Sequence, residues 1–115
     1  MFKNYLTHQV AQNFDRSCRS AQVAEPTKAR LIRSSTQMLD AFARSIEAKN
    51  PKDEAKLFFV ALLNLRDCKE ALEQAGVRVF EIESQFQILH KRLEQLCWGH
   101  ATPGATPRGQ MRLSG

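Results

Sequence analysis

The sequence predicts an all-α protein, specifically an up-down-up-down antiparallel four-helix bundle. Only five glycines and four prolines occur in 115 residues, so few breakers interrupt a helical chain. Four segments carry apolar residues at intervals of three and four, which is the period of one helical face. Short connections between amphipathic helices favour antiparallel neighbours, and these observations together indicate the bundle.

The first two helices are expected over about residues 5–23 and 26–48. Pro26 suits the first turn of the second helix, because its missing N–H would have no partner there. The apolar stripe of the first helix consists of Leu6, Val10, Phe14, Cys18 and Ala21. The stripe of the second helix consists of Leu31, Ser35, Met38, Phe42 and Ile46.

The third helix is expected over Pro51–Ala75, and its two ends carry the clearest signals. Asn50 is a typical cap, Pro51 suits the first helical position, and two acidic residues follow in the first turn. Gly76 is placed to end the helix. The fourth helix should end near Trp98 with Gly99 as the stop. Its stripe, spaced like the seam of a bundle, consists of Ile82, Phe86, Leu89, Leu93 and Leu96.

One domain is expected over residues 1–98, because the chain is long enough for a single core and too short for two. Residues 99–115 have no period and are predicted to be a disordered tail. No window approaches the roughly 20 apolar residues of a membrane span, and no apolar signal region opens the chain, so a soluble, cytoplasmic protein is expected. Three widely spaced cysteines, Cys18, Cys68 and Cys97, are expected to be reduced and buried.

Few residues in the sequence point to catalysis. The three histidines lie far apart, and no Gly-rich phosphate loop or nucleophile elbow occurs. A metal site built from the cysteines and His90 would lack a close ligand pair such as Cys-x-x-Cys. We therefore expect no enzymatic activity, no catalytic residue, no metal and no cofactor.

The stretch Leu57–Leu63 is apolar around the whole helix, which a partly exposed helix does not need. Phe59, Val60 and Leu63 lie to either side of the core stripe and widen the apolar arc beyond what a four-helix core covers. Contiguous exposed apolar surface commonly marks an interaction site. We interpret these three residues as the interface of a homo-oligomer, a closed ring or a dimer. The alternative is that loops or the first helix cover them.

Basic residues along the first two helices are candidates for nucleic-acid binding. The net charge of +5 includes two arginines of the tail, so the distribution of charge matters more than its total. The candidates are Arg16, Arg19, Lys28, Arg30, Arg33 and Arg44. Such a strip would bind phosphates in a salt-dependent, sequence-tolerant way, and an oligomer would repeat it. The alternative is a solvated face with Asp15, Asp40 and Glu47 as counter-charges.

Arg66 follows the core stripe of the third helix closely, and its stem can cover apolar surface. We expect it to fix the register of that helix against a neighbour. The alternative is that Arg66 and Lys69 extend the basic surface.

The chain resembles a group of small bacterial four-helix bundle proteins. The group includes the rRNA intervening-sequence proteins and the accessory variability determinants of diversity-generating retroelements. The stretches similar to the intervening-sequence proteins are Arg33–Ser35, Lys52–Asp53, Phe58–Leu62 and Leu65–Cys68. Ala41–Ser45 departs from the Asn-x-Ala-Glu-Gly stretch typical of those proteins. The stretches that look more like the accessory determinants are Pro26–Arg30, Ser45–Lys49 and Leu93–Trp98.

The resemblance implies a homopentamer with a basic surface that binds RNA or DNA and associates with a reverse transcriptase. We therefore favour a non-enzymatic, oligomeric nucleic-acid-binding accessory protein of the retroelement type. One alternative is a protein of the rRNA intervening-sequence type. Another is an interaction scaffold whose apolar face binds a different partner subunit.

Overall fold

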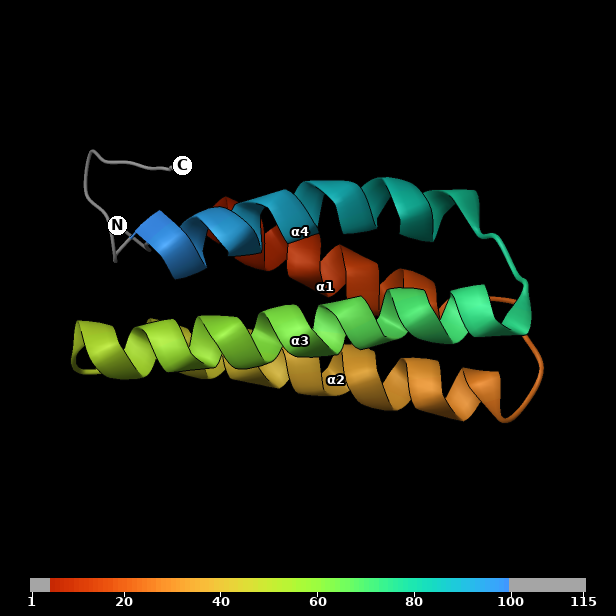
Figure 1. Cartoon of the computed structure of the whole chain (residues 1–115), viewed down its shortest axis with the longest axis horizontal. Coiled ribbons are helices and arrows are strands. Elements are labelled where there is room, and N and C mark those ends of the chain that lie inside the picture. The colour runs from red at the N-terminus through yellow and green to blue at the C-terminus, as the bar shows by residue number, and fades with distance from the viewer. Residues whose placement is uncertain (1–4, 100–115) are drawn as a thin grey trace, which may run out of the picture.

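The computed structural model describes residues 5–99, and this range forms four helices: α1 Tyr5–Ser20, α2 Thr27–Ile46, α3 Pro51–Ala75 and α4 Phe80–Gly99. Each helix runs antiparallel to the one before it, and α1 also packs on α4, so the four close into a bundle (Figure 1). The turn between α2 and α3 lies at the same end as the start of α1 and the end of α4. The predicted all-α four-helix bundle is confirmed. Beyond Gly99, the predicted tail lies outside the described residues.

Both ends of α3 are where the sequence places them. The Asn50 side chain accepts a hydrogen bond from the backbone N–H of Asp53 at 2.9 Å, and Pro51 occupies the first turn. At the other end Gly76 adopts the left-handed conformation with φ of 69°, and the N–H of Val77 donates to the carbonyl of Leu72. Local chemistry alone therefore fixes the length of this helix.

The first two helices are shorter than predicted. α1 ends at Ser20, whose hydroxyl donates to backbone carbonyls of the last turn. Just beyond the helix, the Lys28 ammonium donates to the carbonyl of Ala21. α2 begins at Thr27, so Pro26 precedes the first turn that is predicted to contain it, and its carbonyl accepts a hydrogen bond from the N–H of Arg30. It ends at Ile46. The N–H groups of Glu47 and Ala48 donate to carbonyls three residues earlier, which is the pattern of a 3₁₀ turn.

The core fills the space between the four helices with large apolar side chains. Phe42 and Phe58 lie with ring centroids 5.7 Å apart, and both are fully buried. All six predicted core residues of α3 are buried: Phe58, Ala61, Leu62, Leu65, Cys68 and Leu72. A core of this kind derives its stability from close packing, and removal of one Phe or Leu side chain typically costs about 2–5 kcal/mol.

The predicted stripe of α1 is buried at Phe14, Cys18 and Ala21, and the buried face departs from it only in the first half of the helix. Leu6 is 67% exposed and Val10 is only partly buried, whereas Thr7 and Ala11 are buried in their place. Asp15, a solvated counter-charge in the alternative interpretation of the basic residues, is buried, and its carboxylate accepts hydrogen bonds from Ser35 at 2.7 Å and Arg19 at 2.9 Å. The bond from Ser35 shows that Asp15 faces α2.

The three cysteines are buried free thiols, as predicted. The thiols of Cys18 and Cys68 meet in the core. The hydrogen bond between these two thiols, together with burial, raises the pKa of Cys68. Burial likewise raises the pKa of Cys97. Within residues 5–99, no helix has the length and apolarity needed to cross a membrane.

Candidate interaction surfaces

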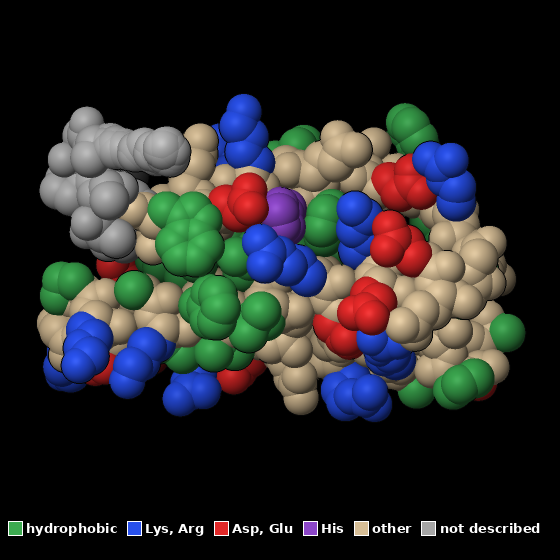
Figure 2. All heavy atoms as spheres, viewed as in Figure 1, with side chains coloured by type: hydrophobic (Ala, Val, Ile, Leu, Met, Phe, Trp, Pro, Cys, Tyr) green, Lys and Arg blue, Asp and Glu red, His purple; other side chains and the backbone are tan. Residues whose placement is uncertain are grey.

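An apolar patch lies on the face made by α3 and α4, near the end where α4 finishes (Figure 2). The patch consists of Phe59, Val60, Leu63 and Trp98, whose side chains are 41–53% exposed. Phe59 and Leu63 are four residues apart on α3, and Val60 and Leu63 are three apart, so they are surface neighbours. The Trp98 ring of α4 joins them, with its centroid 6.4 Å from that of Phe59.

The patch explains the apolar run of α3. Phe58, Ala61 and Leu62 are buried in the core. Phe59, Val60 and Leu63 remain at the surface. The alternative, in which loops or the first helix cover Phe59, Val60 and Leu63, is therefore wrong within the single chain. Trp98 was missed as a member of the patch. Its position two residues beyond Leu96, off the core stripe of its helix, is the sequence signal that indicates exposure.

Beside the patch, a polar cluster joins α3 to α4. The Nε–H of Arg66 donates to Nε2 of His90 at 3.0 Å, and a terminal nitrogen of Arg66 lies 3.3 Å from the Glu94 carboxylate. The other ring nitrogen of His90, Nδ1, lies 3.6 Å from the Glu94 carboxylate. This arrangement fits the register-fixing role predicted for Arg66.

The structure brings three of the six predicted basic residues into one belt across α2. Arg30 and Arg33 line a common hollow of about 390 Å³ between α2 and α3. Arg19 reaches from α1 to hydrogen-bond Thr36, one turn beyond Arg33. We call Arg19, Arg30 and Arg33 the basic belt.

The other three predicted residues lie outside the belt. Arg16 is on α1, one turn before Arg19, and donates to Asn13 at 2.9 Å. The Lys28 ammonium donates a hydrogen bond to the carbonyl of Ala21. Arg44 lies three turns along α2 from Arg33, 3.8 Å from the Asp40 carboxylate, and both of these side chains are about two-thirds exposed.

Two members of the belt already have carboxylate partners. Arg30 donates to both oxygens of Asp67, at 2.6 and 3.2 Å, and Arg19 donates to Asp15 at 2.9 Å. The bonds from Arg30 hold the pKa of Asp67 below its ordinary value, and the positive charge of Arg33 acts in the same direction. The exposed Arg33 guanidinium is therefore the strongest candidate for a phosphate contact.

The side chains that commonly bind metals do not gather in the described part of the chain. Among residues 5–99, no group of three or more His, Cys, Asp or Glu side chains is arranged to hold a metal ion. In the cluster of Arg66, His90 and Glu94, the Arg66 guanidinium already lies beside the histidine and the carboxylate.

No family model, no curated protein and no solved structure matches this chain. The likeness to the small bacterial bundle proteins accordingly rests on the short stretches quoted above.

Proposed function

We propose that this protein is a non-enzymatic accessory protein that assembles with copies of itself and binds nucleic acid. The observation that carries the proposal is the apolar patch. Four large apolar side chains gathered on one face of a small protein are costly to leave in water, and a second protein surface would cover them. Self-assembly uses this face without requiring any further component.

The nucleic-acid part of the proposal is supported by the basic belt. Arg33 is exposed, and Arg19 and Arg30 flank it on neighbouring helix seams. A single copy offers few free cations, but an assembly repeats the belt at fixed spacing, and linked weak contacts bind far more strongly than one. A surface of this kind attracts phosphates through charge and reads little sequence.

The resemblance extends the proposal to its partners. It suggests a basic homopentamer that binds RNA or DNA and works with a reverse transcriptase. The three buried thiols fit a reducing cytoplasm, where we place the protein.

The test is filter binding of the full chain to a structured RNA and to duplex DNA across a salt series. The proposal expects the logarithm of the binding constant to fall linearly with the logarithm of the salt concentration. Binding that is absent at low salt, or that does not change with salt, contradicts the nucleic-acid part.

A second candidate is an interaction scaffold whose apolar patch binds a different protein. The pairing of Arg19 with Asp15 and of Arg30 with Asp67 favours it, since paired arginines contribute less to an electrostatic surface. A chain that stays monomeric at high concentration and does not retain RNA would support this candidate over the first.

A further inference from the structure

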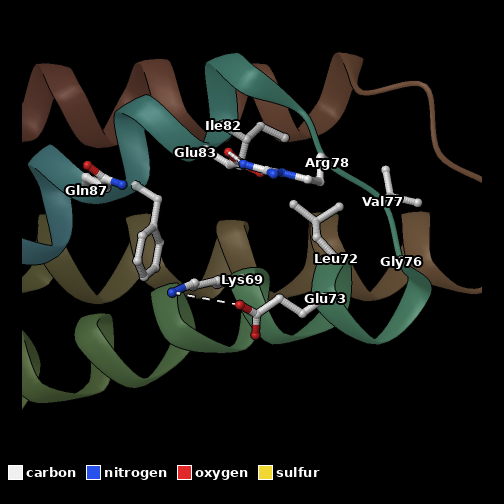
Figure 3. Close-up of a pocket in the computed structure, with 10 residues that line it drawn as sticks. Lys69, Leu72, Glu73, Gly76, Val77, Arg78, Ile82, Glu83 and Gln87 are labelled. Atoms are coloured by element: carbon white, nitrogen blue, oxygen red, sulfur yellow. Dashed lines mark hydrogen bonds and ion pairs between the residues drawn. The ribbon is translucent and has the colours of Figure 1, made fainter.

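Two hollows beside α3 differ in the charge that they offer a ligand. The larger is a groove of about 520 Å³ between the second half of α3 and the start of α4 (Figure 3). On its rim Lys69 lies 3.8 Å from the Glu73 carboxylate, and Arg78 donates to both oxygens of Glu83 at 2.9 Å. Each of these cations has a carboxylate beside it, so the groove offers little net charge to a ligand.

The second hollow, between α2 and α3, is positively charged. Its volume of about 390 Å³ lies within the roughly 300–1,000 Å³ of typical ligand pockets. Three alanines supply its apolar floor: Ala29, Ala71 and Ala75. Two arginines, Arg30 and Arg33, and no acidic residue occur in the described lining. Within residues 5–99, no carboxylate lies at ion-pair distance from the exposed Arg33 guanidinium.

The guanidinium of Arg30 is held in a fixed plane. Its Nε–H and one terminal nitrogen donate to the two oxygens of Asp67 at 3.2 and 2.6 Å, and its other terminal nitrogen donates to Gln74 at 2.9 Å. The Ser34 hydroxyl donates to the same carboxylate at 2.5 Å, which holds Asp67 in place. The N–H groups of a guanidinium lie in its plane, so these bonds occupy its edge. Because the side chain is 29% exposed and lines the hollow, a ligand there meets a flat face of the cation.

Together, Arg30 and Arg33 offer the two contacts that a nucleotide needs. The faces of a guanidinium stack on aromatic rings, and unpaired bases of RNA commonly lie on arginine in this way. Arg33 is one turn further along α2, so its Cβ is about 5–6 Å from that of Arg30. A flat cationic face for a base and an exposed cation for its phosphate therefore stand side by side.

We propose that this hollow binds one unpaired nucleotide of a single-stranded RNA or DNA. The base lies against the face of Arg30 and the alanine floor, and the phosphate binds Arg33. A base within a duplex is stacked between its neighbours and reaches the hollow only after leaving the stack, which costs free energy. The hollow therefore selects unpaired strands and loops. The inference rests on the proposed nucleic-acid binding and names the form of nucleic acid that is bound.

Filter binding of the full chain to two RNAs tests the inference. One RNA is an unstructured single strand, and the other is a duplex with the same number of phosphates, at the same salt concentration. The proposal expects the single strand to bind about tenfold more tightly, although the duplex has the higher charge density. A duplex that binds as tightly as the single strand, or more tightly, would overturn the inference and leave nucleic-acid binding intact.

Arg30→Lys separates the flat face of the side chain from its charge. Lysine keeps the positive charge but has no planar group, so binding of the single strand should fall by about fivefold while binding of the duplex stays unchanged. Arg78→Lys is the matched control, because Arg78 also bonds both oxygens of one carboxylate but lines the other groove. It should bind both RNAs like the wild type. An equal loss for both RNAs in Arg30→Lys would overturn the inference.

Filling the hollow provides a second, independent variant. Ala75 lines the hollow and is exposed, and leucine is a good helix former, so Ala75→Leu should fold normally, as circular dichroism would report. The change adds no charge. Binding of the single strand should fall by about tenfold and binding of the duplex should not change. Unchanged binding of the single strand would overturn the inference.

Adenosine monophosphate as a competitor distinguishes a strand from a free nucleotide. Hollows repeated in an assembly hold one strand at several points, which a free nucleotide cannot match. The proposal expects the single-stranded RNA to stay bound in an about hundredfold molar excess of adenosine monophosphate. Displacement at that excess would assign the hollow to a free nucleotide and overturn the strand as its ligand. A wild-type chain that retains neither RNA would remove both the inference and the proposed nucleic-acid binding.

Discussion

The Trp98 ring lies beside the Phe59 ring, with centroids 6.4 Å apart, although the two residues belong to different helices. Both side chains remain about half exposed, at 53% and 41%. Two aromatic side chains held together at the surface present a large apolar area in a fixed arrangement. Such anchors commonly contribute much of the binding energy of a protein interface.

Replacing Phe59 by Asp should abolish self-association and leave the fold intact. A carboxylate in the middle of the patch would have to lose water on assembly without gaining a partner. The side chain is partly exposed in the single chain, so the thermal unfolding temperature should change little. Sedimentation velocity reports the assembly, and circular dichroism reports the fold.

Ile88→Asp is the matched control for this experiment, because Ile88 is similarly exposed, at 53%, on α4 but outside the patch. It should assemble like the wild type. Loss of assembly in both variants, or in neither, would show that the patch is not the contact.

Arg33→Gln should weaken RNA binding and make it less dependent on salt. Each lost phosphate contact reduces the slope of the logarithm of the binding constant against the logarithm of the salt concentration by about 1. The measurement is filter binding across a salt series, with several unrelated RNA sequences that should weaken alike. Lys91→Gln removes an exposed cation from α4 and is the matched control. An equal loss in both variants would point to net charge rather than to the basic belt.

The pairing of Arg30 with Asp67 should make stability depend on pH in the acidic range. Hydrogen bonds from Arg30 lower the pKa of Asp67 in the folded chain below its ordinary value of 3.8. Because the folded pKa is the lower one, the stabilisation is complete above about pH 5 and is lost progressively as the pH falls below 3.8 and through the lower pKa of the folded chain. Asp67→Asn should therefore lower the free energy of unfolding by about 1 kcal/mol at neutral pH and by less in acid.

Urea unfolding at pH 7 and pH 3 checks this. Asp40→Asn is the control, because Asp40 pairs with Arg44 at 3.8 Å on the open surface. Its effect should stay within about 0.5 kcal/mol. If wild type and Asp67→Asn differ by the same amount at both pH values, the carboxylate is not the source of the effect.

Gly76→Ala should destabilise the fold by about 1 kcal/mol, because φ of 69° is unfavourable for a residue with a Cβ atom. No atom lies within 4 Å of an added Cβ, so the cost is purely conformational. Gly76→Asn should cost less, since asparagine tolerates this conformation better than alanine. Chemical denaturation gives both values. An alanine variant as stable as the wild type would contradict the assigned helix end.

Local signals explain why so much of the fold could be predicted. Asn50, Pro51 and Gly76 act on the backbone beside them, so the bounds of α3 could be predicted from adjacent residues. The apolar period of α3 likewise identifies its buried face.

The errors arise where distant residues decide the outcome. Asp15 is buried where Ser35 on another helix donates a hydrogen bond to it, and the sequence around Asp15 does not indicate this partner. Arg30 pairs with Asp67, which lies 37 residues further along the chain, and the spacing of basic residues on α2 did not indicate this partner. Trp98 joins the patch only because α4 runs antiparallel to α3 in one register. Composition and spacing carry no information on such contacts.

The most direct test of self-assembly through the apolar patch is the molar mass of the full chain by light scattering, over a concentration series. The account predicts a mass that is a multiple of the 13.1 kDa chain and that falls to a single chain in the Phe59→Asp variant. A wild-type chain that remains at 13.1 kDa at high micromolar concentration would contradict it.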